Sequence, residues 1–468
     1  MRRMSFLTSK NLDMTEGNLY KKLWIFTIPL IFAGLLQLLY NACDLVVCGR
    51  FGSEHSVGAI GATNSIINLI LNFFIGLSIG TNVLMSRAYG SKDDERGKRI
   101  AYTSMILSVV LGIIVTIIGV IISPYFLEWM GTPDEQIDLS TDYLQIYFLG
   151  SIFTLIYNFG ASLLRATGDS RKPFIFLATA GLLNVVLNLI LVIGFNLDVK
   201  GVAIATVASQ AFSAILVVIA LLKSTGFLTF NLKEIRFYSK EAKQIFIIGG
   251  ATGIQSIIFS LSNILIQSSV NSLGAEVVDG NSASQSLEGF IYQAMNQSAQ
   301  GGLAFISANY GAQNYKNIKK CILYALSNIL VVWGIVAGLI MIFHSPLIKL
   351  YVSSGDKPHY AWERLFIISI TYFLCGFMDL MAYSLRGIGY SVLPTIISLI
   401  GACGLRIVYI FTLFRLDYFH NIRWLSATYP ISWIITMSVH IAFLIPLFRK
   451  KENAYTISIE NEKTAALE

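Results

Sequence analysis

The sequence predicts an all-α polytopic membrane protein with twelve transmembrane helices, in two halves of six that are related by pseudo-twofold symmetry. Three observations lead to this prediction. The 468 residues are 55% hydrophobic and only 13% charged, whereas soluble domains carry roughly 25% charged residues. Several long stretches, such as residues 100–127 and 245–275, contain no charged residue at all. A pattern of residues in the first half also returns in the second.

Each long apolar stretch is predicted to be one helix, because about 20 helical residues cross a hydrocarbon core roughly 30 Å thick. The predicted spans cover residues 20–43, 56–86, 100–123, 143–164, 173–196, 201–222, 245–273, 283–308, 321–344, 363–385, 392–414 and 428–448. The first span is too long for a cleaved signal peptide and lacks a small-residue cleavage pattern. It is therefore counted as a membrane helix.

Lysine and arginine residues predict the orientation of these spans, since they collect in the cytoplasmic loops of membrane proteins. With the N-terminus inside, the inner segments hold 26 of the 34 Lys and Arg residues and the outer segments hold seven. We therefore expect both termini in the cytoplasm of a multi-pass protein of a bacterial-type inner (plasma) membrane. The net charge of +7 is then mostly topogenic, and we expect no nucleic-acid partner.

Two motifs occur twice, 221 residues apart in the chain. The first is Gly80-x5-Ser86-x2-Tyr89-Gly90, which returns as Gly301-x5-Ser307-x2-Tyr310-Gly311. The second is Leu164-Arg165-x2-Gly168-x-Ser170-x2-Pro173, which returns as Leu385-Arg386-x2-Gly389-x-Ser391-x2-Pro394. Because each half has an even number of spans, both halves enter the membrane with the same orientation. Such repeats are related by an axis along the membrane normal.

The repeat and the charge pattern predict four segments along the chain. An N-terminal lobe of spans 1–6 covers residues 1–222, and a polar, basic cytoplasmic linker covers residues 223–243. A C-terminal lobe of spans 7–12 covers residues 244–450. We expect the tail, residues 451–468, to be polar and disordered.

The chemistry-bearing residues argue for transport rather than catalysis. The five cysteines form no CxxC pair, and the five histidines are scattered without metal-ligand spacing. We expect no cofactor and no enzymatic activity, because a membrane enzyme would need clustered acid–base residues or a phosphate-binding loop. A membrane protein of two homologous halves is most often a transporter, with its site where the halves meet. A receptor or scaffold remains an alternative.

With both repeats and Asp44-x4-Gly49-Arg50-x-Gly52 at the end of span 1, the chain resembles the multidrug and toxic compound extrusion (MATE) transporters. The resemblance covers about residues 15 to 448. It implies two six-helix bundles around a central cleft, and a secondary active exporter that works by alternating access. The implied activity is antiport of cationic, amphiphilic compounds against sodium or protons. One chain supplies both lobes, so we expect a functional monomer.

The chain departs from the family at several intramembrane carboxylates. Asp44 matches the acid of the family's first span. Phe259 stands where NorM-type members carry a glutamate on span 7, and Cys375 stands where they carry an aspartate on span 10. DinF-type members place an aspartate on span 5, where this chain offers only Asn184 and Asn188. The resemblance therefore leaves open whether sodium or the proton is the coupling ion.

Three carboxylates fall within predicted spans, and each shares a helical face with other polar side chains. A charge at the bilayer centre costs at least about 2.5–3.5 kcal/mol on insertion scales, so such acids indicate a function or a buried partner. The polar rows are Gln37, Asn41 and Asp44 on span 1; Gln285, Glu288, Tyr292 and Asn296 on span 8; and Tyr372, Asp379 and Tyr383 on span 10. Asn68 lies in a row of asparagines on span 2.

These rows yield specific expectations for function. Ion coupling is expected at Asp44, Glu288, Asp379 and Asn41, and the resemblance to DinF-type members adds Asn184 and Asn188. If sodium is the ion, Asp44 is its expected site. The organic cation is expected to contact Gln37, Asn68, Gln285, Tyr292, Asn296, Tyr372 and Tyr383. Structural roles compete, such as a salt bridge of Asp44 with Arg50, or of Asp379 with Arg386 or Arg406. The alternative function is a flippase of lipid-linked sugars or another solute carrier of the same superfamily, although such flippases commonly have more cationic clefts.

Overall fold

The computed structural model describes residues 12–53 and 55–465, and the regular structure in these ranges is entirely helical. The ends of the predicted N-terminal lobe and tail, residues 1–11 and 466–468, lie outside the described residues. The chain forms two compact units. Unit 1 is built on Ile28–Ile257, and unit 2 is built on Met14–Thr27 together with the chain from Ile258 onward.

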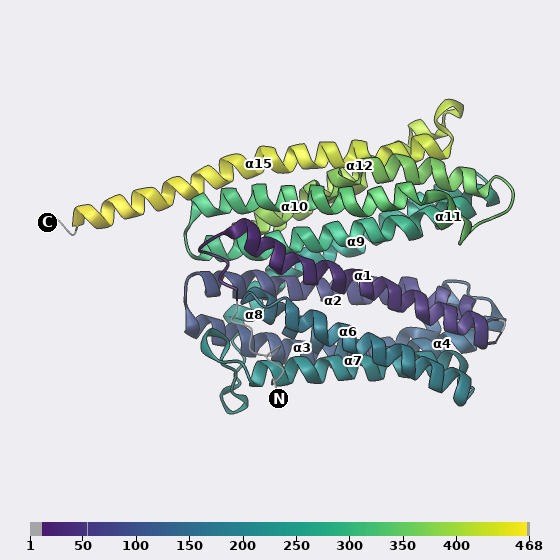
Figure 1. The fold of residues 1–468 in the computed structure, drawn as a ribbon, viewed down its shortest axis with the longest axis horizontal. Helices are drawn as coiled ribbons and strands as arrows, with labels where there is room; N and C mark the ends of the chain where they lie inside the picture. The colour runs from purple at the N-terminus through teal and green to yellow at the C-terminus, as the bar shows by residue number, and fades with distance from the viewer. Residues whose placement is uncertain (1–11, 54, 466–468) are drawn as a thin grey trace. The chain divides into compact units, whose positions relative to one another are not determined.

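Unit 1 contains most of α1, the whole of α2 to α7 and the beginning of α8 (Figure 1). The bounds are α1 Leu19–Phe51, α2 Ser56–Gly90, α3 Asp94–Trp129, α4 Asp134–Leu149, α5 Ser151–Ala166, α6 Arg171–Asn188, the π-helical turn η2 Leu189–Gly194, α7 Asp198–Leu222, and the 3-10 turns η3 Gly226–Leu228 and η4 Leu232–Glu234. Helix α3 packs against α4 and α5, and α7 packs against α4, α5 and α6.

Unit 2 contains the remainder of α8 and all later helices. The bounds are α8 Ser239–Asn271, α9 Ala275–Gly311, α10 Tyr315–Ile342, α11 His344–Lys349, α12 Lys357–Gly387, α13 Val392–Ser398, the π-helical turn η5 Leu399–Gly404, α14 Leu405–Phe411, the 3-10 turns η6 Leu413–Arg415 and η7 Asp417–Phe419, and α15 Ile422–Ala465. Helix α12 packs against α9, α10 and α15.

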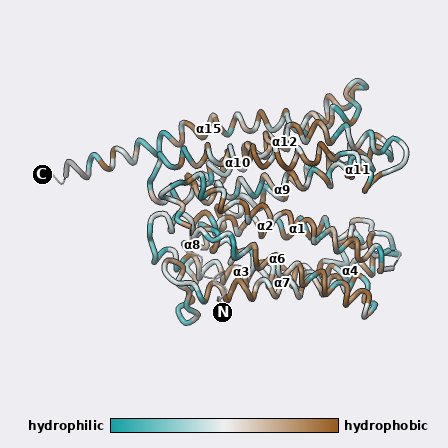
Figure 2. The backbone as a smooth tube through the Cα atoms, in the orientation of Figure 1, coloured by the Kyte–Doolittle hydropathy of each residue, from teal (hydrophilic) through white to brown (hydrophobic). Residues whose placement is uncertain are grey.

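All twelve predicted spans lie on these helices. In the described part of the chain, ten helices are long and apolar enough to cross a membrane, and α4 with α5 forms an eleventh as a pair bent by 44°. Helix α9 has 37 residues and is long enough to cross a membrane. It is not among the ten apolar helices, because serine, asparagine and glutamine recur along it. Hydrophobic residues follow the helices and hydrophilic residues gather at their connections (Figure 2). The all-α polytopic membrane fold is confirmed, and the structure is consistent with twelve spans.

The internal repeat is visible in the backbone hydrogen bonds. After α2, the amides of Lys92 and Asp93 donate to Tyr89 and Ala88. After α9, residues 313 and 314 donate in the same pattern to residues 310 and 309. Lys92 and Gln313 both adopt positive φ, at 54° and 55°, in the left-handed region where non-glycine residues are uncommon. The same tight turn therefore joins repeat-equivalent helices.

The residue after each of these turns caps the next helix. The carboxylate of Asp93 accepts a hydrogen bond from the amide of Arg96 at 2.9 Å, and the Asn314 side chain accepts one from the amide of Asn317 at 3.1 Å. These side chains satisfy amides that the first helical turn leaves without a partner.

We expect Asp93→Ala and Asn314→Ala each to lower the free energy of unfolding by about 0.5–2 kcal/mol, because each removes an N-cap. Chemical or thermal unfolding of the purified variants measures this. Asp93→Asn keeps a capping oxygen and is the matched control, which should stay close to the parent protein. Equal stability of Asp93→Ala and the parent would contradict the capping role.

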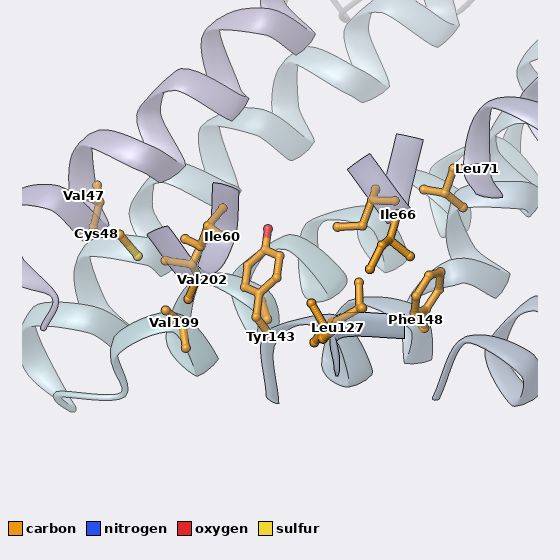
Figure 3. Packing of buried hydrophobic residues seen from close by; sticks show 14 of the residues in the cluster. Val47, Cys48, Ile60, Ile66, Leu71, Leu127, Tyr143, Phe148, Val199 and Val202 are labelled. Atoms are coloured by element: carbon orange, nitrogen blue, oxygen red, sulfur yellow. The ribbon is translucent and has the colours of Figure 1, made fainter. Parts of the chain in front are cut away.

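The core of unit 1 forms where α1, α2, α4 and α7 meet. Tyr143 of α4 is buried beside Val202 of α7 and Ile60 of α2, and Cys48 of α1 belongs to the same cluster (Figure 3). These side chains come from helices that are distant in sequence, and their packing joins the end of α1 to α2, α4 and α7. The cysteine is one of five free cysteines, and here it is a small packing residue.

The boundaries of units 1 and 2 differ from those of the predicted lobes at two places along the chain. The predicted lobe 1–222 included the beginning of α1, but Met14–Thr27 groups with unit 2. The predicted lobe 244–450 included the beginning of α8, but the helix up to Ile257 groups with unit 1. Helices α1 and α8 are therefore each shared by both units.

Local contacts explain why the beginning of α1 groups with unit 2 and the beginning of α8 groups with unit 1. In unit 2, the Asn309 amide donates to the carbonyl of Met14 at 2.9 Å. In unit 1, Gly253 of α8 packs so closely against α2 that a Cβ there would lie 2.5 Å from the Phe73 carbonyl oxygen. Small residues allow membrane helices to approach closely. The predicted linker also packs within unit 1, where the ring of Phe230 lies 5.1 Å from that of Tyr102.

The tail was expected to be disordered, and this expectation is wrong for the described residues, because α15 continues to Ala465. The yellow helix extends past its neighbours in Figure 1. The Lys319 ammonium pairs with the Glu452 carboxylate at 2.9 Å, and the Tyr315 and Tyr455 rings lie 5.6 Å apart. Because the preceding span has already nucleated the helix, each further residue adds a hydrogen bond at little extra cost.

Candidate ion and substrate sites

In unit 1, four polar side chains from three helices meet around Asp44. The amide nitrogen of Asn188 donates to Asp44 Oδ1 at 2.5 Å and to Asn184 Oδ1 at 3.3 Å. The Thr206 hydroxyl donates to Asp44 Oδ2 at 3.5 Å and accepts from the Asn184 amide at 3.3 Å. Asp44 is 7% exposed and Asn188 is fully buried. The structure thus brings together three predicted coupling residues and adds Thr206, which the sequence did not single out.

This cluster, called the Asp44 cluster below, has more acceptors than donors. Both carboxylate oxygens of Asp44 accept from neutral groups only, and no ion pair joins Asp44 to Arg50. The Asn188 Oδ1 atom is buried and accepts no hydrogen bond from any residue that the structure describes. Buried acceptors without a donor are costly. A proton on the carboxylate, or a small cation among these oxygens, would remove the imbalance.

Close contact between α1 and α6 positions the cluster. The Tyr40 hydroxyl donates to the carbonyl of Ala178 at 3.2 Å. The Tyr40 ring covers Gly181, where a Cβ would overlap the ring atoms. Asp44 lies one turn after Tyr40 on α1, and Asn188 lies two turns after Gly181 on α6. The absence of a side chain at Gly181 therefore leaves room for the Tyr40 ring, one turn from the Asp44 carboxylate.

We expect Gly181→Ala to destabilise unit 1 by about 1–3 kcal/mol, because overpacking forces side chains or backbone to shift. The matched control is Gly194→Ala in η2, where a Cβ would meet no atom within 4 Å. Thermal unfolding of both variants measures the difference. If Gly181→Ala were as stable as Gly194→Ala, the close approach of the two helices would be wrong.

In unit 2, Glu288 of α9 forms a bidentate ion pair with Arg364 of α12. The Arg364 Nε and Nη2 atoms each lie 2.9 Å from a carboxylate oxygen of Glu288, and Ser284 donates to Oε1 at 2.6 Å. Both side chains are buried. The sequence led us to expect Glu288 to offer its negative charge to a cation, but the neighbouring guanidinium neutralises that charge.

Asp379 of α12 has a different environment. Its carboxylate accepts from the Asn296 amide at 3.2 Å, and Asn296 in turn accepts from Gln300 at 2.7 Å. The Asn296 amide also donates to the Tyr292 hydroxyl at 3.4 Å. Arg406, one of the two salt-bridge partners considered from the sequence, donates to the Ser432 hydroxyl instead. The Asp379 carboxylate thus lies in a polar network with Tyr292, which is 40% exposed.

Aromatic rings extend this region of unit 2. The Tyr292 and Tyr372 rings lie 6.3 Å apart, and Tyr372 stacks on Trp433 with centroids at 5.2 Å. Tyr383 is buried beside the Arg386 guanidinium, which lies 5.5 Å from its ring. The predicted substrate residues Asn296 and Tyr292 therefore lie in one hydrogen-bond network with Asp379, and Tyr372 adjoins this network through the Tyr292 ring.

Four predicted residues do not join either cluster. Gln37, Asn41, Asn68 and Gln285 are exposed and make no side-chain hydrogen bond within the described ranges. Their roles in ion coupling and substrate binding remain predictions. Helical periodicity placed these residues on polar faces of their helices, but it does not show which neighbouring helix each face contacts.

The residues that sequence reasoning missed are Thr206 and Arg364. Thr206 lies in an uncharged span that also contains Ser209, Gln210 and Ser213, so its hydroxyl did not stand out in the sequence. Arg364 lies at the beginning of a predicted span, and from the sequence it therefore counts among the charged residues of an outer loop. The sequence feature that could have identified Arg364 is its positive charge, which can pair with the intramembrane Glu288. No group of three or more His, Cys, Asp and Glu side chains suited to a metal ion occurs in the described part of the chain.

One family model, MatE, matches the chain twice, at residues 29–190 and 251–412. The two matches together cover more than half of the 468 residues. The chain belongs to the MatE family. The family model matches once in each half of this MatE protein, which agrees with the internal repeat and its paired turns.

Relatives of this MatE protein are similar over most of its length. The chain is 26% identical over 407 residues to the probable multidrug resistance protein YoeA of Bacillus subtilis, covering 85% of this chain and 88% of the relative. It is 27% identical over 399 residues to the probable multidrug resistance protein YpnP of the same organism, covering 85% and 89%.

Solved structures show the same fold. An outward-facing multidrug resistance MATE transporter of the MOP superfamily aligns with a TM-score of 0.87 at 21% identity, covering 95% of this chain and 99% of the other. The family consists of membrane transporters, so this MatE protein is one as well.

Proposed function

We propose that this protein is a secondary active multidrug exporter that antiports cationic, amphiphilic compounds against sodium or protons by alternating access. Family membership supports transport, and the names of the relatives from Bacillus subtilis support drug-like substrates. The observation that carries the proposal is the Asp44 cluster, which is buried, rich in oxygen atoms and short of donors.

The Asp44 cluster supports a coupling role because it can hold either ion. Carboxylate, amide and hydroxyl oxygens suit a hard cation such as sodium, and a proton on Asp44 would supply the missing donor. Asn184, Asn188 and Thr206 hold the carboxylate in place. We propose that the bound ion stabilises one conformation of the transporter, and that its release permits the other.

The organic cation is proposed to contact Asp379 and the neighbouring rings of Tyr292 and Tyr372. A carboxylate offsets the loss of water around a cation, and aromatic faces attract cations. Glu288 is not assigned this role, because Arg364 already occupies its carboxylate. Coupling requires that ion and substrate favour different conformations, since a ligand shifts an equilibrium only by its differential affinity.

The proposal is tested by efflux of ethidium from pump-deficient cells that express the protein. Sodium and proton gradients are collapsed separately, and cells with an empty vector provide the background. We expect efflux above background that disappears when one of the two gradients is removed, which identifies the ion. Efflux that survives loss of both gradients would contradict ion-driven antiport.

A further inference from the structure

A second guanidinium lies close to the Glu288–Arg364 pair in unit 2. Arg406 of α14 is buried, and its Nε atom donates to the Ser432 hydroxyl at 2.9 Å. Its guanidinium carbon lies 4.0 Å from the centroid of the Tyr429 ring and 5.8 Å from that of Trp433. Helices α14 and α15 thus hold a cation against two aromatic rings.

No carboxylate of the described residues pairs with Arg406. Glu288 is occupied by Arg364, and no ion pair to Arg406 occurs in the part of the chain that the structure describes. The Arg364 guanidinium lies over the same Tyr429 ring, at 5.0 Å. Two guanidinium groups therefore share one ring and only one carboxylate, which leaves an excess of one positive charge.

The N–H donors of this cluster are also in excess. The Nη1 atom of Arg364 is buried without a hydrogen-bond partner. On Arg406, Nε is the only nitrogen with an acceptor among the described residues. Charged side chains are rarely buried unless they are paired, and a neutral hydroxyl with an aromatic face does not replace a counterion. The chemistry that is missing here is an anionic acceptor.

The neighbouring rings indicate which anion fits. A guanidinium presents a planar fork of N–H groups that matches the two oxygens of a carboxylate. Trp433 stacks on Tyr372 beside this fork, so the surroundings suit a flat aromatic body attached to the carboxylate. A small inorganic anion would satisfy the charge without making an aromatic contact.

We propose that Arg406, together with Arg364, Tyr429 and Trp433, forms a binding site for the carboxylate of an aromatic compound. Such a site extends the range of ligands from organic cations to aromatic acids and to zwitterions that carry both charges. It lies wholly within unit 2 and does not depend on the ion-driven export proposed above.

Equilibrium dialysis of the purified full-length protein with radiolabelled benzoate tests this site without any transport. We expect saturable binding that unlabelled benzoate displaces, while neutral benzamide at the same concentration does not. Chloride and inorganic phosphate, each added alone as competitors, distinguish a general anion site from a carboxylate site. We expect both to compete at least about tenfold more weakly than benzoate, the equivalent of roughly 1.4 kcal/mol.

Variants assign the binding to Arg406. Arg406→Gln is expected to weaken benzoate binding at least about tenfold, and Arg406→Lys less, since the charge stays and the fork is lost. Arg415→Gln is the matched control, because Arg415 is exposed and lies beside Phe411 instead. Ser432→Ala provides a second test if Arg406→Gln does not fold, since it removes only the hydroxyl that orients Arg406.

Two results would overturn the proposal. One is equal binding of benzoate and benzamide, or stronger competition by chloride than by benzoate. The other is benzoate binding that is unchanged in a folded Arg406→Gln protein, or in Ser432→Ala and Arg406→Lys if Arg406→Gln does not fold. Loss of ethidium efflux with intact benzoate binding would contradict the exporter proposal and leave this site supported.

Discussion

Asp44→Asn is expected to lower the rate of ion-driven ethidium efflux at least about tenfold, because it removes the only charge in the Asp44 cluster. Losing roughly 1.4 kcal/mol of ion binding is enough for that effect. The amide keeps the size of the side chain but cannot take up a proton, and it offers one oxygen where the carboxylate offers two. Efflux from cells or proteoliposomes with a defined gradient measures the loss.

The matched control is Asp142→Asn in the same unit. Asp142 forms an exposed ion pair with Lys200 at 2.9 Å, so its neutralisation should leave efflux unchanged. Thr206→Val is expected to reduce efflux less than Asp44→Asn, since it removes one neutral oxygen and keeps the charge. Normal gradient-dependent efflux by an equally expressed Asp44→Asn protein would show that coupling occurs elsewhere, with Asp379 as the next candidate.

Glu288→Gln is expected to lower the free energy of unfolding by about 3–5 kcal/mol, because breaking a buried ion pair leaves the partner charge uncompensated. The effect should be large at this site, since Arg406 already adds a second positive charge nearby. Thermal unfolding of the purified protein in a fixed detergent measures it.

A double variant separates this effect from loss of packing. Glu288→Gln combined with Arg364→Met removes both charges, and it is expected to recover much of the stability that Glu288→Gln loses. Asp142→Asn serves again as the control, because an exposed ion pair contributes only about 0–1 kcal/mol. If Glu288→Gln unfolded like the control, the bidentate pair with Arg364 would be wrong.

Hydropathy and the internal repeat predicted the helices well. Each of the twelve predicted spans lies on a helix, and the repeated motifs return as paired turns with positive φ at Lys92 and Gln313. The prediction failed at the tail, where α15 continues through contacts of Tyr455 and Glu452 with α10. Polarity alone predicted disorder, because a sequence window does not reveal which neighbouring helix will support it.

The site predictions were limited in the same way. Periodicity identified Asp44 as a polar position within a span, and the resemblance to MATE transporters drew attention to Asn184 and Asn188. The structure places these three residues in one cluster. Neither argument identified Thr206, because one hydroxyl does not stand out in a span that also contains Ser209, Gln210 and Ser213. Periodicity also treated Glu288 as an available charge, because Arg364 is 76 residues away in sequence.

The sequence by itself determined the membrane class, the positions of the helices and the two-fold repeat. These depend on local composition, on the free energy of transferring each segment into lipid and on short motifs that recur at a constant spacing. Only the tertiary structure decided which acids have a cationic partner. Among the described residues, helix packing joins Glu288 to Arg364, gives Asp44 neutral partners and provides no carboxylate for Arg406. Such pairings depend on distances that no sequence pattern encodes.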